Sequence, residues 1–186
     1  MSGVISGKTH FFSDRLELLD IGTKIAQRDG IWVEFGVYRG ESINFIAKRT
    51  NRVIYGFDSF WGLPEDWTPT HPAGTFSTRG ELPPVRENVS LVPGLFASTL
   101  PDFLKSVGDN KITFMHVDCD LYSSSKLVLK MTMNSLTKGS VIVFDEFCGL
   151  TIDDEARAFR EEAKARNLHY SFIGCSQSGA VCVLVD

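Results

Sequence analysis

The segment from Trp32 to Ser42 constrains the fold more than any other part of the chain. A short apolar run ends in Glu34, two glycines follow at 36 and 40, and an amphipathic stretch occupies 41–50. This order is typical of a strand, a tight turn and a helix. Glycine has no Cβ, so its backbone can approach a ligand closely, and the start of a helix presents free N–H groups. The segment therefore predicts a site for a nucleotide-like cofactor.

Helical and strand-like patterns alternate along the whole sequence of 186 residues. We expect helices at 13–27, 41–50, 100–107, 124–136 and 153–166, the first capped by Ser13 and the last facing solvent. We expect strands at 31–35, 53–57, 89–92, 112–117, 140–144, 169–173 and 180–185. Strands separated by helices predict an α/β fold, with a doubly wound, mostly parallel seven-stranded sheet and helices on both faces. The last two strands predict a C-terminal antiparallel hairpin that adds an antiparallel edge strand. We expect one domain over residues 1–186.

Composition and charge exclude several classes of partner. The formal net charge of −4 gives no basic surface for nucleic acid. No apolar run approaches the length of a membrane span. The first residues lack the pattern of a signal peptide, and the four cysteines form no C-x-x-C pair, which is typical of free thiols in a reducing compartment. We therefore expect a cytoplasmic protein without a membrane partner.

Acids follow most of the early strands, where an α/β sheet binds its ligands. Asp58 comes about twenty residues after the glycine turn, where a carboxylate can accept hydrogen bonds from ribose hydroxyls; the alternative is a loop cap. The turn reads E-x-G-x-x-x-G and lacks the G-x-G-x-x-G of dinucleotide binders. Glu34 would repel a pyrophosphate but would suit S-adenosylmethionine, which carries a sulfonium and an amino group.

The later acids predict a metal site. Neighbouring strands lie about 4.8 Å apart, so Asp118 and Asp145 should end side by side. Adjacent carboxylates repel each other unless a positive charge lies between them. Mg²⁺, or another divalent cation such as Mn²⁺ or Ca²⁺, would meet that need. The alternative is a solvated acidic rim that caps the following helices.

Two further features concern the reaction itself. Segment 59–88 carries five prolines and several aromatic residues, is too long for a plain connection, and is expected to cover the site; the alternative is an ordinary surface excursion. His116 lies two residues before Asp118 and so on the same face of its strand. It is a candidate general base, with a structural histidine as the alternative. His10 and His71 are the other histidines that could reach an acceptor.

Five blocks in order then resemble one family. These blocks are Val33–Ser42, Gly56–Pro64, Val92–Phe96 with Thr99–Pro101, Val117–Ser123 and Val143–Glu146. Together they are similar to the macrocin O-methyltransferase family, whose members are metal-dependent class I methyltransferases that use S-adenosylmethionine, many on sugar hydroxyls of natural products. The resemblance implies an O-methyltransferase with a small-molecule acceptor.

The resemblance also implies a role for individual residues. The residues implied to surround the cofactor are Glu34, Gly36, Tyr38, Gly40, Ser42, Asp58, Ser59, Gly94 and Ser98. The implied metal ligands are Asp118, Asp145 and Glu146. Apart from the resemblance, our hypothesis for the reaction is that Asp118 or a histidine, with His116 as the candidate, takes the proton of the acceptor. The chain departs from the family pattern at Glu146, where an aspartate is usual, and near Ser98, where an acid usually contacts the adenine.

Two other functions stay open on the sequence. Asp118-Cys-Asp120 is a D-x-D motif, which metal-dependent glycosyltransferases also use. A non-catalytic small-molecule-binding domain of the same fold is the second alternative. Because the family has a longer N-terminal region, the resemblance implies an acceptor pocket that is more open or is completed by a second subunit in a homodimer.

Overall fold

The computed structural model describes residues 10–27, 29–148 and 153–184 and confirms the expected α/β class. The strands are β1 (His10–Phe11), β2 (Ile31–Phe35), β3 (Ile54–Asp58), β4 (Val89–Pro93), β5 (Ile112–Val117), β6 (Leu136–Phe144), β7 (Tyr170–Cys175) and β8 (Ala180–Leu184). The helices are α1 (Arg15–Ile25), α2 (Glu41–Ala47), α3 (Phe96–Val107), α4 (Tyr122–Thr132) and α5 (Asp154–Ala165), with a 3₁₀ turn at Met133–Ser135. No helix among these residues is both long and apolar enough to cross a bilayer.

The described strands form one sheet in the order β1-β7-β8-β6-β5-β2-β3-β4. The pairs around β2 and β5 are parallel, and β8 is antiparallel to both β6 and β7. The expectation of seven strands was wrong by one, because His10–Phe11 pairs with β7. The hairpin also differs from the prediction, since its antiparallel strand β8 lies inside the sheet, between β6 and β7, and not at an edge.

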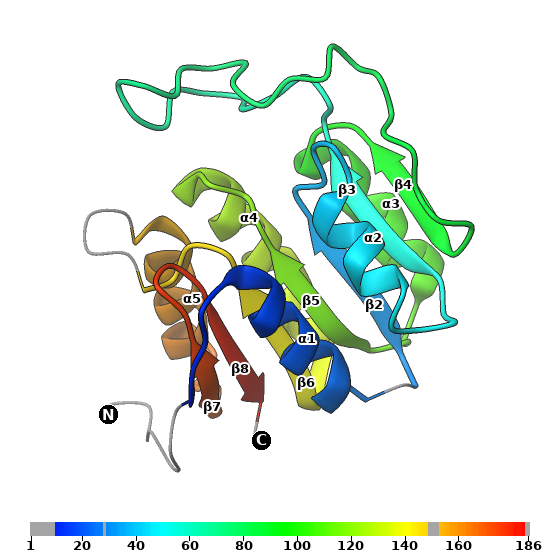
Figure 1. The fold of residues 1–186 in the computed structure, drawn as a ribbon. Helices are drawn as coiled ribbons and strands as arrows, with labels where there is room; N and C mark the ends of the chain where they lie inside the picture. The colour runs from blue at the N-terminus through cyan, green and yellow to red at the C-terminus, as the bar shows by residue number, and fades with distance from the viewer. Residues whose placement is uncertain (1–9, 28, 149–152, 185–186) are drawn as a thin grey trace.

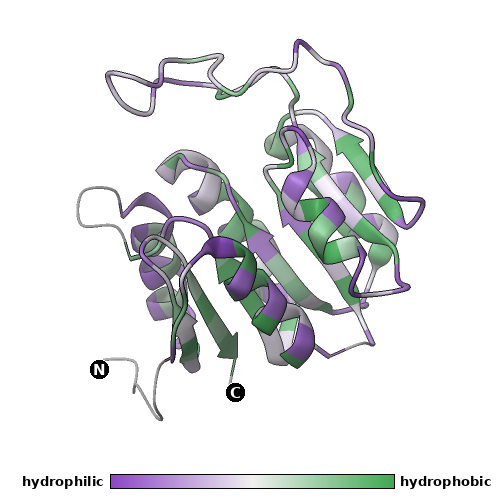
Figure 2. Ribbon diagram, viewed as in Figure 1, coloured by the Kyte–Doolittle hydropathy of each residue, from purple (hydrophilic) through white to green (hydrophobic). Residues whose placement is uncertain are grey.

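Helices cover both faces of the sheet, as predicted (Figure 1). On one face, α1 and α2 pack on strand residues such as Trp32 and Phe114. On the other face, α3, α4 and α5 pack on residues such as Phe35 and Met115. Figure 2 shows that the strands are mostly hydrophobic, whereas α1 and α2 alternate between hydrophilic and hydrophobic residues. Burial of these two apolar faces is the main force that stabilises the layers.

Two helices differ from their prediction in a way that bears on the site. The cap of α1 is Asp14, whose carboxylate accepts from the Glu17 N–H, and Ser13 instead donates its backbone N–H to Glu17. The helix α5 was expected to face solvent, but it buries Glu155 and Phe159, which are four residues apart and therefore lie on the same face of the helix. Its charge-rich sequence hides this apolar face because two of the buried residues are glutamates.

Segment 59–88 crosses above the carboxyl edge of the sheet (Figure 1). It leaves β3 and returns to β4, which are neighbours at one end of the sheet. Between them it reaches the opposite half of the molecule, where the Trp67 indole donates to Asp154 at 3.3 Å and Glu65 accepts from Ser123 on α4. We call this segment the 59–88 loop.

Candidate functional site

A cavity of about 690 Å³ opens at the carboxyl ends of β2, β3, β5 and β6, beneath the 59–88 loop. The chain winds outward from β2 to β4 and then returns to β5 on the other side of β2, so this is the switch point of the sheet. Ligands of doubly wound sheets bind at such a point, and the volume lies within the range of roughly 300–1,000 Å³ typical of small-molecule sites.

The glycine turn forms one wall of this cavity. Gly36 has a φ of +91°, and any Cβ at this position would clash with the backbone carbonyl oxygen of Asp118. The close approach that requires glycine is therefore between two strand ends within the protein. Gly40 has a φ of +81° and begins α2, so its own need for glycine is a left-handed helix start.

Asp58 ties this turn to β3. One carboxylate oxygen accepts the backbone N–H groups of Val37 and Tyr38, each at 2.8 Å, and the other accepts the Phe60 N–H at 2.7 Å. Asp58 thus acts as a loop cap, which was the alternative interpretation. It also lines the cavity, and a carboxylate has about four lone-pair positions, so it can still accept a ribose hydroxyl.

Behind the glycine turn lies a buried polar chain. Glu34 has no exposed surface and accepts from the Ser42 hydroxyl at 2.9 Å, while its other oxygen lies 3.1 Å from Nδ1 of His116. Burial tends to lower the pKa of His116, but the hydrogen bond and charge of Glu34 and the charges of Asp118 and Asp145 give a net rise. This chain joins α2 to the center of the sheet.

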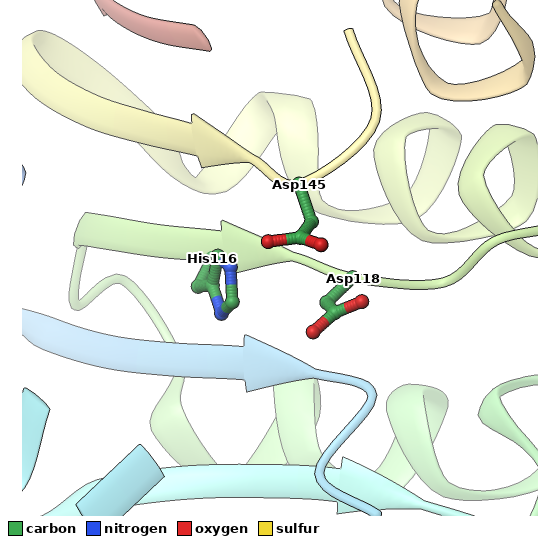
Figure 3. A group of neighbouring side chains, drawn as sticks. All are labelled: His116, Asp118 and Asp145. Atoms are coloured by element: carbon green, nitrogen blue, oxygen red, sulfur yellow. The ribbon is translucent and has the colours of Figure 1, made fainter. Parts of the chain in front are cut away.

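Four acids follow β5 and β6, and we call Asp118, Asp120, Asp145 and Glu146 the acid cluster. The Asp118 N–H donates to Phe35 and the Asp145 N–H donates to Val117, at 2.9 and 3.0 Å, so both acids continue the strand ladder. Asp118 and Asp145 are consequently neighbours, as the sequence predicted. Figure 3 shows their side chains together with His116 at the ends of adjacent strands.

The donor atoms of this region suit a divalent cation. Ligand atoms of His116, Asp118 and Asp145 lie within 4.8 Å of one another, and so do those of Asp118, Asp120 and Glu146. The expected trio of Asp118, Asp145 and Glu146 is thus divided between two groups that share Asp118. Buried Asp145 Oδ1, Glu146 Oε2 and His116 Nε2 have no hydrogen-bond partner among the described residues, and such orphaned groups suit coordination.

The pKa values of Asp118, Asp120 and Glu146 rise because these three carboxyl groups are buried and lie close to other acids. Burial, then the charges of Asp118, Asp120 and Asp145, raise the pKa of Glu146 to about 9. Burial, then Asp145 and Asp58, raise the pKa of Asp120 to about 7. Burial and the Asp145 charge also raise the pKa of Asp118 well above its usual value. Carboxylates with such values need a nearby cation to stay ionised.

A positively charged side chain of the protein itself, Arg15, lies beside the acid cluster. The guanidinium of Arg15, at the start of α1, lies 3.6 Å from Asp118 and 3.8 Å from Asp145 and donates a hydrogen bond to Glu41 at 2.9 Å. Burial tends to lower the pKa of Arg15, but Asp145, Asp118 and Glu41 give a net rise. The sequence prediction missed this residue, because only the fold brings α1 to the ends of β5 and β6.

A second missed residue is Glu155 of α5. Its fully buried carboxylate accepts the backbone N–H groups of Cys119 at 2.9 Å and Glu146 at 3.1 Å. These two N–H groups belong to the two segments that carry the acid cluster. Burial, then Glu146 and Asp118, raise the pKa of Glu155 well above its usual value. A glutamate placed at the helical spacing of core residues was the signal available in the sequence.

The structure places most of the expected site residues on the cavity wall. The expected residues that line it are Gly36, Tyr38, Ser42, Asp58, Ser59, Gly94, Asp118, Asp145 and Glu146. Glu34 and His116 are buried behind this wall. Gly40 begins α2, and Ser98 is exposed in the first turn of α3, next to Ala97 on the wall. Their contacts with a cofactor stay predictions.

The 59–88 loop forms the roof of the cavity, and its role as a cover over bound ligands stays a prediction. The loop residues that line the cavity are Ser59, residues 62–65 and Phe76. The Phe76 ring meets the Tyr38 ring edge-on at 5.6 Å between centroids. His71 stacks on Phe76 and contacts Thr68 and Thr70 within the loop. His10 lies in β1 on the far edge of the sheet.

These features define a class I methyltransferase-like α/β domain. Residues 33–147 match a family described as a methyltransferase domain. The chain belongs to this methyltransferase-domain family. The finer assignment to the macrocin group is not part of this match.

Individual relatives are similar at low identity. An 8-demethyl-8-(2,3-dimethoxy-α-L-rhamnosyl)-tetracenomycin-C 4′-O-methyltransferase from Streptomyces olivaceus is 28% identical over 160 residues, which cover 72% of this chain. The matched part spans 60% of the length of that relative.

Solved structures share the fold. The calicheamicin methyltransferase CalS11 superposes with a TM-score of 0.72 at 24% identity, covering 90% of this chain and 76% of CalS11. The O-methyltransferase NovP gives 0.71 at 19% identity, covering 92% of this chain and 80% of NovP. An O-methyltransferase from Bacillus cereus in complex with SAH gives 0.59 at 14% identity, covering 92% and 80% of the two chains.

Proposed function

We propose that the protein is an S-adenosylmethionine-dependent O-methyltransferase that acts on a hydroxyl of a sugar or another natural product, with Mg²⁺ or another divalent cation. The observation that carries this proposal is a single cavity lined on one side by the glycine turn and Asp58 and on the other by the acid cluster. One side suits a nucleoside and the other suits a cation with oxygen ligands. The resemblance to macrocin O-methyltransferases supports the same assignment.

S-adenosylmethionine, when bound, supplies an electrophilic methyl group, and a divalent cation supplies positive charge that stabilises a developing alkoxide. The protein holds the donor against the wall that the glycine turn and Asp58 form together. The roof, with Phe76 against Tyr38, limits the access of water to this wall. Holding donor and acceptor in a fixed orientation lowers the entropic cost of the reaction.

Asp118 is the proposed acceptor of the hydroxyl proton. It lines the cavity, and a carboxylate placed beside the acceptor can serve as a general base. His116, the other candidate base, lies behind the wall with Nδ1 against Glu34. We therefore assign to His116 the role of stabilising the charges of Asp118 and Asp145 from the interior of the sheet.

The names of the relatives support a choice of acceptor to test first. One is named for methylation of a rhamnosyl group on tetracenomycin, and CalS11 is described in a second structure as a TDP-rhamnose 3′-O-methyltransferase. A deoxysugar hydroxyl is thus the first acceptor to test. Membership of the methyltransferase-domain family favours methyl transfer over the glycosyltransferase interpretation of the D-x-D motif. The non-catalytic alternative predicts cofactor binding without methylation of any acceptor.

The test combines binding with turnover. We expect S-adenosylhomocysteine, and not a nucleoside diphosphate, to bind in calorimetry, and rhamnosylated acceptors to gain 14 mass units per methyl group only with a divalent cation present. Asp145→Ala should abolish turnover and leave the affinity for S-adenosylhomocysteine nearly intact. The matched control is Asp102→Ala, an exposed acid on α3 away from the cavity wall. Equal loss of binding and turnover in Asp145→Ala would contradict the metal role.

A further inference from the structure

Arg15 lies beside the acid cluster with its positive charge, and its position is not explained by its own helix. It is the first residue of α1, where the positive end of the helix dipole disfavours a cation. Asp118 and Asp145, together with Glu41, supply the compensating negative charge. The location of Arg15 is therefore set by the acids that it faces.

The backbone of Arg15 is fixed on both sides of the helix start. The Asp14 carboxylate accepts the Glu17 N–H at 3.0 Å, and the Glu17 carboxylate accepts the N–H of Ser13, the residue before the cap, at 2.8 Å. Before it, the Phe12 N–H donates to Cys175 at 2.8 Å. Only the long side chain of Arg15 is free to change its position relative to the acids.

The distances show two unequal sets of partners. Arg15 makes its hydrogen bond to Glu41 at 2.9 Å, whereas its contacts with Asp118 and Asp145 are 3.6 and 3.8 Å, beyond hydrogen-bond length. Glu41 is the more exposed partner, with 72% of its side chain accessible. Glu41 thus draws the guanidinium toward the rim, and it leaves oxygens of the cluster, such as Asp145 Oδ1, without a partner.

We propose that Arg15 is an internal competitor of the divalent cation at Asp118 and Asp145, and that Glu41 holds it at the rim so that the cation can bind. This inference rests on the proposed function only for the existence of the metal site. Arg15 is a positioning residue in this proposal, since it acts on the acids. Its positive charge neutralises the acids when no ion is bound and repels a second cation when one is.

The proposal predicts opposite effects for the two residues on metal affinity. Removing the competing charge in Arg15→Met should tighten Mn²⁺ binding by about tenfold or more, because two of the ligating carboxylates lose a cation within 4 Å. Arg15→Lys keeps the positive charge, so its Mn²⁺ affinity should stay close to that of the wild type. Glu41→Gln should weaken binding, because Arg15 loses its partner at the rim.

A double-mutant cycle separates this proposal from a simple change of net charge. In the Arg15→Met background, Glu41→Gln should have much less effect on Mn²⁺ affinity than in the wild type, because its action passes through Arg15. Lys24→Met is the matched control, since it removes a positive charge from an exposed position of the same helix, where Lys24 pairs with half-buried Asp20 at 2.6 Å.

The experiment is titration of the full chain with Mn²⁺ in a calorimeter, with S-adenosylhomocysteine present, after thermal denaturation has shown that each variant folds. Tighter binding in Arg15→Met, with Lys24→Met unchanged, supports the proposal. Unchanged or weaker binding in Arg15→Met overturns it, as does equal tightening in Lys24→Met. If neither the wild type nor Arg15→Met binds Mn²⁺, the inference fails, while binding of S-adenosylhomocysteine would still stand as support for the methyltransferase.

Discussion

Glu155 offers the sharpest test of how the acid cluster is held. Each oxygen of its buried carboxyl group accepts one backbone N–H, from Cys119 at 2.9 Å and from Glu146 at 3.1 Å. Whether the group is charged or neutral, both oxygens retain a lone pair for these bonds. Glu155→Gln keeps the shape of the side chain but replaces one oxygen with an NH₂ group, which cannot accept.

The expected cost follows from one buried donor without a partner. Such a loss is worth about 1–3 kcal/mol, and for a chain of this size each kcal/mol lowers the midpoint of thermal unfolding by roughly 2–4 °C. We therefore expect Glu155→Gln to unfold about 2–12 °C below the wild type. Because the freed N–H belongs to a segment of the acid cluster, Mn²⁺ affinity should fall more than affinity for S-adenosylhomocysteine.

The assay is chemical denaturation with thermal scans, repeated on Glu161→Gln as the control. Glu161 lies on the same helix but is exposed and bonds to Lys126 and Tyr122, and contacts of this kind are worth about 1 kcal/mol or less. If Glu155→Gln lies within about 0.5 kcal/mol of the wild type, a change normal for surface substitutions, the bracing role of Glu155 is refuted.

Three other perturbations test separate parts of the structure. Gly36→Ala should lower the free energy of unfolding in denaturant titrations by about 2–6 kcal/mol, because of backbone strain and a clash with the Asp118 carbonyl. The control Gly74→Ala, at a φ of +84° with open space around it, should show only the strain. Equal losses in the two variants would contradict the clash. Without metal, the free energy of unfolding should fall as the pH rises from about 4.5 to about 9. The reason is that folded Glu146, beside Asp118, Asp120, Asp145 and Arg15, retains a proton that the unfolded chain releases. Mn²⁺ should reduce this fall, and stability that increases over the same pH range would contradict the raised pKa of Glu146. Trp67→Phe removes the hydrogen bond to Asp154 and should speed hydrogen exchange in the 59–88 loop at a cost of about 1 kcal/mol, while Trp61→Phe, at an exposed ring, should leave exchange unchanged.

Local patterns predicted the parts of the fold that depend on neighbouring residues. The order of strand, glycine turn and helix around Gly36 and the position of Asp118 and Asp145 at adjacent strand ends both follow from short-range periodicity and the parallel sheet. The two-residue strand β1 was missed because His10–Phe11 carries no alternation, and it forms only by pairing with β7, far away in the chain.

Long-range contacts explain what the sequence could not provide. Arg15 occurs in an ordinary helical pattern, and nothing local distinguishes it from a solvated charge. For Glu155 the one local signal is its helical spacing from the apolar residues of α5. Their roles arise because α1 and α5 bring them to the same strand ends from different layers of the fold. The division of Asp145 and Glu146 between two groups of acids depends on side-chain directions after β6, which the spacing of the residues does not determine.

The contact between Gly36 and Asp118 sets the distance between the glycine turn, where the cofactor is proposed to bind, and the acid cluster, where the cation is proposed to bind. Main-chain atoms make this contact, and the Asp118 N–H is bonded to Phe35 in the same ladder. The glycine turn and the acid cluster cannot move apart without breaking the hydrogen bonds between β2 and β5 in the middle of the sheet. Selection for a new acceptor would therefore leave this spacing untouched and act on the roof and rim, so related chains with different acceptors should superpose at this point even where their loops share no length or sequence.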